Sequence, residues 1–416
     1  KTPDSHGFVA PVGAMPDAVS LDDDNNYFFH LRQGDCDFGQ HDCMIESAAA
    51  DLLFLSEYYL TTRDITALCV SLRKMENIVS LLESRRDESN MFRVGAGANL
   101  LAPSYAGSRL DDGSFSWGYH SGVQVTYCAA LRRMIEVQKL LNREDKVSEY
   151  TAYLNSALEA LPKFLTQEGY LVNYIDQAGI HHGVYGAEQF GYMQTTCNHD
   201  AIAFGVFDLE TSRKCYRQLA SVTGLWVDGL IRNNYPALDD TYHHWGETET
   251  DEYLWRYGVW VNGGIWGTNV ARMLLAQFRL DEFADARKCL ESFLAEFRQG
   301  IAPAIWKGSE FPSPGRPNEL DSYAVMGAAL RGLWDCRYDA TSLTIEPHVP
   351  TEIRHLKQKQ PLRFGLAQIF VELFNEGTKT VSVTLNGVDL EPKSQIVLPF
   401  DSLKKGQNQL VIRMGK

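Results

Sequence analysis

Pairs of amphipathic helices recur along most of this chain, and that repetition limits what it can fold into. Apolar residues return at steps of three and four over 42–59, which predicts a helix. A second helix is predicted to run to Leu82, and Asp64 stands where an N-cap residue is preferred. Because the turn at 61–63 is short and polar, the two helices are expected to form an antiparallel hairpin.

The same unit is repeated further along the sequence. Pairs are predicted at 119–141 with 146–165, 197–207 with 210–222 and 261–279 with 281–298, and one more helix follows at 319–335. The first helices of successive pairs begin roughly sixty to eighty residues apart, a period typical of closed or superhelical arrays of hairpins. The sequence therefore predicts a mostly α fold built as a closed or superhelical array of helical hairpins.

Long loops separate the hairpins, whereas the turns inside them are short. These loops are rich in glycine, proline and aromatic residues, and they cover 86–117, 167–195, 224–258 and 300–318. Long loops in a compact domain are usually functional. In an array of antiparallel hairpins they all emerge on the side where the first helix of each pair begins, so we expect them to converge on one rim.

The end of the sequence has a different pattern. β-branched alternating segments occur at 343–345, 366–374, 379–385 and 409–413, and Asn386-Gly387 is a hairpin-turn signal. Three regions are expected: an extended N-terminal segment over 1–35, the helical toroid over 36–337 and a small antiparallel β-sandwich over 338–416.

The composition limits the kinds of molecule that this chain is expected to bind. The formal net charge of −14 and the lack of a clustered basic face argue against nucleic acid and favour neutral substrates, unless a local basic pocket overrides this. Without a run of eighteen apolar residues, no membrane span is expected. Eight cysteines stand singly, as buried reduced thiols would, and no signal peptide precedes Lys1, so the expected location is cytoplasmic.

Acidic residues are dense before the first helix. Asp35, Asp37 and Asp42 fall within eight residues, and Glu46 follows inside the helix. Helix capping explains Asp42 and Glu46, because carboxylates are stabilised at a helix N-terminus. Three aspartates exceed what one cap requires, so Asp37 and Asp42 are also candidates for catalysis.

The densest mixture of acids and aromatic rings lies at 242–252 and just beyond it. It contains Trp245, Glu247 and Glu249 and continues to Trp260, and five of the eight tryptophans lie between 226 and 266. Ring faces suit the C–H face of a pyranose, and carboxylates suit its hydroxyls. The alternative is a structural aromatic cluster beside an exposed acidic loop.

Other candidates open the second and third hairpins. Trp117 and His120 precede one first helix, Glu188 lies on the next loop, and His199 and Asp200 begin another helix. A lone histidine more often has a structural role than a ligand-binding one. His199 stands directly beside Asp200 at a helix start, however, and this pair raises the chance of a polar pocket. No ligand spacing for a metal and no dinucleotide or phosphate-loop motif occurs, so neither a metal nor a cofactor is predicted.

The segment 260–269 carries a family resemblance. Its N-G-G-I-W core, which opens a helix, resembles the six-hairpin glycosidases, such as glucoamylase, trehalase, α-rhamnosidase and the maltose and cellobiose phosphorylases. The resemblance implies an (α/α)6-type toroid followed by a β-sandwich, with Asn262 and Trp266 near the substrate. It covers most of 36–416 as architecture and transfers no catalytic residue. About nine helices are recognisable, whereas a full ring has twelve.

We therefore expect an inverting glycoside hydrolase that acts on a neutral or short oligosaccharide. One carboxylic acid would protonate the leaving oxygen and a second carboxylate would activate water. Glu249 is preferred for the acid within the 247–252 loop, or else Glu188, with Asp37 or Asp42 facing it. Trp117, Trp245, Trp260 and His199 would line the pocket. The sequence leaves open a glycoside phosphorylase, a polysaccharide lyase and a non-catalytic carbohydrate-binding module.

Overall fold

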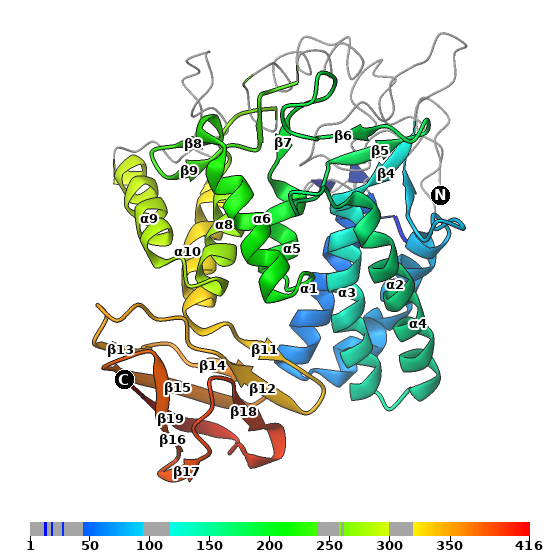
Figure 1. Ribbon diagram of the computed structural model, residues 1–416. Coiled ribbons are helices and arrows are strands. Elements are labelled where there is room, and N and C mark those ends of the chain that lie inside the picture. Colours follow the sequence, from blue (N-terminus) through cyan, green and yellow to red (C-terminus); the bar gives the residue numbers. More distant parts are fainter. Residues whose placement is uncertain are drawn as a thin grey trace.

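The computed structural model describes residues 12–14, 18–19, 27–28, 45–94, 117–238, 258, 262–298 and 319–416. Within these residues the protein has nine α-helices, followed by β-sheets in its C-terminal part. The short strands β4 and β5 lie at one end of the helices, and β11 to β19 lie at the opposite end (Figure 1). The predicted mostly α architecture with a C-terminal β part is thus present.

The predicted helix pairs are all found. They are α1 (Ile45–Thr62) with α2 (Ile65–Glu83), α3 (Ser121–Leu140) with α4 (Glu144–Ala160), α5 (Thr196–Ala203) with α6 (Leu209–Ser221), and α8 (Gly267–Arg279) with α9 (Phe283–Arg298), followed by α10 (Glu319–Trp334). Three of the tight turns use a residue with positive φ, namely Arg63, Asn142 and Asp281.

Two predicted helix C-termini and one predicted helix start were wrong. The helix predicted at 261–279 begins at Gly267. The helix predicted at 197–207 ends at Ala203, because Gly205 takes φ +64° and lets the chain leave the helix. The helix predicted to reach 165 ends as an α-helix at Ala160 and continues as the 3₁₀ turn Leu161–Phe164. Pro162 lies in that turn, and its ring cannot supply the N–H that a longer α-helix needs.

The first helices of the pairs form the inner layer. α1 packs on α3, α3 on α5, α5 on α8 and α8 on α10, whereas each second helix packs on its own partner. The ends of this series approach each other, since Arg331 of α10 lies 3.5 Å from Glu57 of α1. Consistent with an inner position, α3 buries most of its residues, whereas α4 buries one face only.

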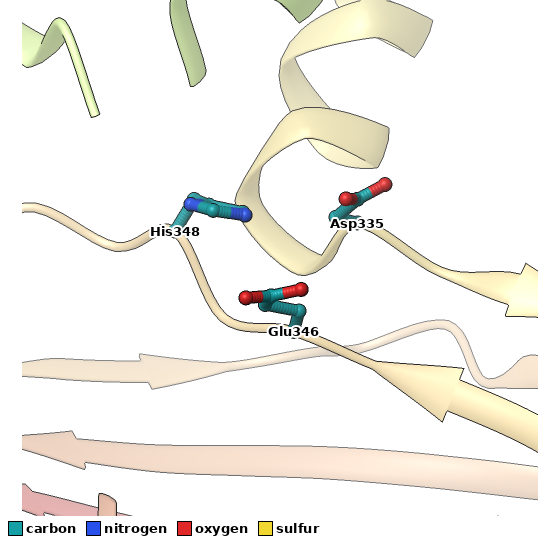
Figure 2. A group of neighbouring side chains, drawn as sticks. All are labelled: Asp335, Glu346 and His348. Atoms are coloured by element: carbon teal, nitrogen blue, oxygen red, sulfur yellow. The ribbon is translucent and has the colours of Figure 1, made fainter. Parts of the chain in front are cut away.

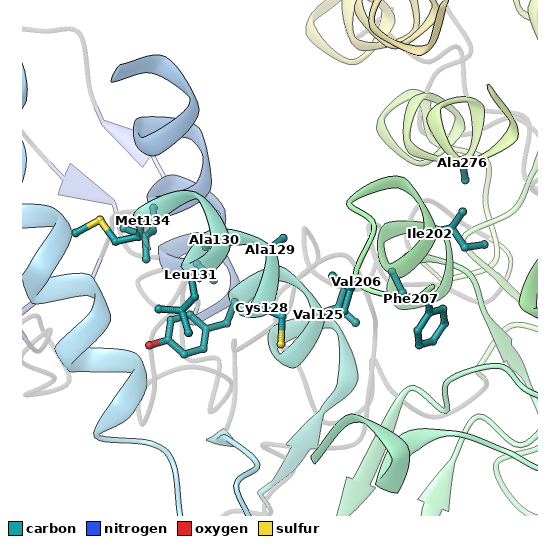
Figure 3. Packing of buried hydrophobic residues seen from close by; sticks show 14 of the residues in the cluster. Val125, Cys128, Ala129, Ala130, Leu131, Met134, Ile202, Val206, Phe207 and Ala276 are labelled. Atoms are coloured by element: carbon teal, nitrogen blue, oxygen red, sulfur yellow. The ribbon is translucent and has the colours of Figure 1, made fainter. Parts of the chain in front are cut away.

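Small apolar side chains let the inner helices approach closely. Figure 3 shows Val125, Ala129 and Leu131 of α3 together with Ile202 of α5 and Ala276 of α8. All five are buried. Each fully buried valine, leucine or isoleucine contributes about 1.5–3 kcal/mol relative to an exposed one. This packing fixes the inner helices relative to one another, and with them the positions of their N-terminal ends.

Short strands lie at those N-terminal ends. β3 (Arg93–Val94), β4 (Gly118–His120), β5 (Tyr174–Asp176) and β6 (His181–His182) form one sheet, β7 (Met193–Gln194) pairs with β10 (Asn234–Tyr235), and β8 (Trp226–Val227) pairs with β9 (Leu230–Ile231). β1 (Ala18–Val19) pairs with β2 (Tyr27–Phe28). The long inter-hairpin loops are therefore partly fixed by backbone hydrogen bonds.

The C-terminal part contains two sheets. The smaller comprises β11 (Arg337–Tyr338), β12 (Ser342–Ile345) and β18 (Ile396–Pro399); the larger comprises β13 (His355–Lys357), β14 (Leu362–Phe364), β15 (Ala367–Asn375), β16 (Lys379–Leu385), β17 (Val388–Leu390) and β19 (Gly406–Gly415). β19 lies between β15, to which it is parallel, and β16. The predicted turn joins β16 to β17, with positive φ at Asn386 and Gly387.

Arg63 connects the helices to these sheets. Its two terminal nitrogens donate to the carbonyls of Ala340 and Asp339, each at 2.6 Å. Its guanidinium also lies 4.4 Å from the ring centre of Phe364 and 4.9 Å from that of Phe400. One side chain in the α1–α2 turn thus binds backbone and rings of the C-terminal part.

Among the described residues no helix has the length and apolar character needed to cross a membrane. The six cysteines within the described ranges are free thiols, and five of them are buried.

Candidate functional site

A buried polar cluster lies at the N-terminal ends of the inner helices. Glu46 is the second residue of α1, and Thr126 lies in the second turn of α3. His199 and Asp200 come from α5, and Arg272 comes from α8. Four helices separated by long stretches of sequence therefore bring one acid–base group together at the end of the helices that also carries β4 and β5 (Figure 1).

Asp200 links the cluster. Its Oδ1 lies 2.9 Å from Nδ1 of His199, and its Oδ2 accepts a hydrogen bond of 2.7 Å from Nη1 of Arg272. Asp200 and His199 are almost completely buried. A buried carboxylate needs such partners, since an unpaired charge in this environment is costly. The arrangement fixes the orientation of the imidazole.

His199 presents a free acceptor. Burial lowers the pKa of this imidazole, although Asp200 acts in the opposite direction, so the neutral form is favoured. With Nδ1–H directed at Asp200, Nε2 carries a lone pair. That Nε2 is buried and has no hydrogen-bond partner among the described residues. A buried polar atom without a partner requires a ligand or a water molecule.

Glu46 has a strongly altered acidity. Burial raises its pKa from 4.5 to about 7; the neighbouring Arg272 lowers it, Asp200 raises it and the Thr126 hydrogen bond lowers it. Only 7% of the residue is exposed, and Thr126 Oγ1 donates to its Oε1 at 3.3 Å. A carboxyl group that is half protonated near pH 7 is suited to general acid catalysis.

A stack of rings lies on the adjacent strands. His120 stacks on Tyr174 with centroids 5.2 Å apart, Tyr174 lies 4.1 Å from His182, and His182 stacks on Phe190 at 3.7 Å. Burial, with the nearby His182, lowers the pKa of His120 to about 3. His120 is therefore neutral and packs as an aromatic ring, a position from which it supports the start of α3.

Buried amide side chains attach the loops to the helices. Asn262 accepts from the backbone N–H of Leu238 at 2.7 Å and donates to its carbonyl at 2.6 Å. Asn198 of α5 makes the same pair of bonds to Leu171, at 2.7 and 3.0 Å. Asn262 was predicted to contact substrate; its side chain holds the Leu238 backbone in place.

The other described candidates lie around this end of the molecule. Trp117 packs edge to face on Tyr119 at 5.4 Å, and the guanidinium of Arg93 lies 4.1 Å from its ring centre. Trp266 is the residue before α8. Glu188 is exposed on the loop between β6 and β7. The remaining candidates lie outside the described residues: Asp37, Asp42, Trp245, Glu247, Glu249 and Trp260.

Sequence reasoning identified the neighbours His199 and Asp200 but missed two of their partners. Glu46 was assigned to helix capping, because an acid in a first turn fits the helix dipole. Arg272 was not considered at all. The available signal was an ionisable residue among the apolar residues of the first helices α1, α5 and α8, where an unpaired charge would be costly.

A second cluster of titratable side chains lies just beyond the C-terminal end of α10. Asp335, Glu346 and His348 each direct one potential metal-ligating atom to within 4.8 Å of the others (Figure 2). Two of these side chains already have partners: His348 Nδ1 lies 2.8 Å from Asp281, and Arg279 lies 3.4 Å from Asp335. Among the described residues this is the one group with metal-ligand geometry, and it joins the helices to the sheets.

No family model matches the chain, and no curated protein matches it. Solved structures do resemble it. A sialidase aligns with a TM-score of 0.55 and 9% identity over 86% of this chain and 32% of its own. An uncharacterized conserved protein from Thermus thermophilus aligns with a TM-score of 0.50 and 13% identity over 78% of this chain and 84% of its own. A rhamnosidase from Klebsiella oxytoca aligns with a TM-score of 0.47 and 11% identity over 77% of this chain and 50% of its own.

The chain thus spans 50% of the rhamnosidase chain and 32% of the sialidase chain. At such low identity the likeness concerns the fold alone. The sialidase and the Thermus thermophilus protein share a fold with this chain at that level.

Proposed function

We propose that the chain is a glycoside hydrolase that cleaves a neutral or short oligosaccharide with paired carboxylates and inversion at the anomeric carbon. The observation that carries the proposal is the buried Glu46, whose pKa of about 7 lets it hold a proton at neutral pH. The inner helices would close into an (α/α)6-type toroid with Glu46 at its mouth, and the two C-terminal sheets would form a β-sandwich.

Glu46 is assigned the role of general acid. A glycosidic oxygen leaves readily only if it is protonated as the bond breaks, and the donor must still carry its proton at working pH. Glu188 is exposed on its loop, whereas Glu46 is buried, so Glu46 replaces Glu188 in this role. Asp200, with both oxygens bonded, positions Arg272 and His199 rather than reacting.

The second carboxylate would come from the rim. Glu249, Glu247, Asp37 and Asp42 precede or follow the inner helices in sequence, and one of them would deprotonate the attacking water. An inverting pair needs a separation of about 6.5–9.5 Å, which acids on different segments can reach. His199 Nε2 would accept a hydrogen bond from a sugar hydroxyl, and Trp117, Trp245, Trp260 and Trp266 would offer ring faces.

The test is a panel of nitrophenyl glycosides and short oligosaccharides, each assayed with and without inorganic phosphate. The wild type is compared with Glu46→Gln and with Glu144→Gln, which alters an exposed glutamate in the first turn of the outer helix α4. Loss of a general acid should lower kcat by about 10²–10⁴-fold. The NMR spectrum of the first product gives the anomeric outcome.

Hydrolysis that is lost in Glu46→Gln and kept in Glu144→Gln supports the proposal. Product formation that requires phosphate would identify a phosphorylase instead, and unsaturated products absorbing in the ultraviolet would identify a lyase. Near-normal turnover by Glu46→Gln would reject the assignment of the acid.

A further inference from the structure

A cavity lies at the end of the inner helices opposite the Glu46 cluster. It has a volume of about 380 Å³, and α1, α3, α8 and α10, the C-terminal end of α5 and Arg337 of β11 contribute to its walls. Glu57 lies eleven residues after Glu46 on α1, which is roughly 16 Å along a helix axis at 1.5 Å per residue. The cavity is therefore separate from the Glu46 cluster and faces the C-terminal sheets.

The walls of this cavity are rich in arginine. Its lining includes Arg132, Arg133, Arg279, Arg331 and Arg337. In a chain whose formal net charge is −14, five guanidinium groups around one small volume reverse the local sign. A concavity in which one sign of charge predominates concentrates the field and attracts ions of the opposite sign.

Nearby carboxylates offset only part of this charge. Arg279 lies 3.4 Å from Asp335, Arg331 lies 3.5 Å from Glu57, and Arg133 and Arg337 share Asp339 at 3.2 and 3.8 Å. These three carboxylates pair with four of the five arginines, and Glu136 also acts on Arg133. Most of these contacts are long for charge-assisted hydrogen bonds, which measure about 2.7–2.9 Å.

Arg132 stands out in the group. It has no carboxylate partner among the described residues, and Nη1 donates to the carbonyl of Gly205. Burial lowers its pKa, and the like charges of Arg133 and Arg279 lower it further. Helix C-termini attract cations, which accounts for one hydrogen bond to Gly205. A guanidinium has five N–H donors, so most of those on Arg132 remain available.

We propose that this cavity binds a small molecule through a phosphate dianion held by Arg132 and the arginines around it. Guanidinium groups match phosphate oxygens in pairs of parallel hydrogen bonds. The volume lies within the usual range for small-molecule sites and leaves room beside the phosphate for a group of monosaccharide size. Free phosphate and a phosphorylated sugar share this chemistry.

Isothermal titration calorimetry on the full chain tests the site with inorganic phosphate, glucose 6-phosphate and, as the uncharged control, glucose. Wild type is compared with Arg132→Gln, with Arg331→Gln and with the matched control Arg287→Gln on the exposed surface of α9. The two cavity variants should weaken phosphate binding at least about tenfold, and the control should not. Raising sodium chloride from about 0.05 to 0.3 M should weaken it further.

Tighter binding of glucose 6-phosphate than of inorganic phosphate supports a phosphorylated sugar as the ligand, and equal binding supports the free oxyanion. Arg331 is largely exposed, so its variant reports on the cavity even if Arg132→Gln does not fold. The proposal is overturned if neither anion binds at about 10 mM, or if both cavity variants bind as the wild type does.

Discussion

Arg272 of α8 and Asp200 of α5 are joined by a hydrogen bond of 2.7 Å across two inner helices. Asp200 is fully buried, and the side chain of Arg272 is 22% exposed, so the pair is shielded from solvent on most sides. Both charges also act on Glu46, in opposite directions. Burial is the main cause of the raised pKa of Glu46, and the contact that connects the two helices adjusts it.

Asp200→Asn should lower both the stability of the protein and the pKa of Glu46. Removing one charge from a buried pair leaves the other uncompensated, and the free energy of unfolding should fall by about 3 kcal/mol. The pKa of Glu46 should fall, because a negative neighbour is lost while Arg272 remains. Urea unfolding measures the first effect and a pH–rate profile the second. Glu291→Gln, which breaks the exposed Arg287–Glu291 pair, should change stability by less than about 1 kcal/mol.

Glu46→Gln should make stability less dependent on pH. The folded pKa is raised from 4.5 to about 7, so the contribution of Glu46 is fully present below pH 4.5 and is lost as the pH rises through 7. Glutamine never ionises. At pH 8 the variant should be more stable than the wild type by about 3 kcal/mol, and at low pH the two should converge. Thermal unfolding from pH 5 to 8 gives the comparison, and a constant difference would contradict it.

His348 should titrate above its ordinary value of 6.5. Its burial acts to lower the pKa, but Asp281, Asp335 and Glu346 together raise it. The stability that it contributes is complete below pH 6.5 and declines as the pH rises through the folded pKa. Proton NMR of the histidine rings measures this directly. Asp281→Asn should lower the value, and His120, whose pKa burial lowers to about 3, should stay neutral throughout.

Arg63→Ala should loosen the attachment of the C-terminal part. The variant loses two hydrogen bonds from a charged donor and two ring contacts, which together amount to about 3 kcal/mol. Arg63→Lys keeps the charge but loses the planar fork, so most of the loss should remain. Chemical unfolding measures the change. Arg73→Ala, at a position of α2 away from these contacts, serves as the control and should leave stability unaltered.

The sequence was sufficient for the helix pairs and for the β character of the C-terminal part, because periodicity and turn chemistry are local. It also placed His199 and Asp200 together, since they are neighbours in the chain. The pairing of Asp200 with Arg272 joins positions 72 residues apart and has no local signature. The strands β3 to β10 are two or three residues long, too short for an alternating pattern to be recognised.

The raised pKa of Glu46 could not be predicted from the neighbouring sequence either. It depends on burial by four helices and on the charges of Arg272 and Asp200, none of which a window around residue 46 contains. The predicted residues Glu247, Glu249, Asp37 and Asp42, which lie outside the described part of the chain, remain predictions. Site-directed variants of each would test them separately.

The position of β19 has a consequence for how the protein is made. Residues 406–415 supply a central strand, with β15 on one side and β16 on the other. During translation those two earlier strands leave the ribosome with facing edges unpaired, and unpaired edges invite association between chains. The sheet can close only after residue 415 has emerged. We expect the nascent chain to be most prone to aggregation in the interval between the emergence of β16 and the pairing of β19.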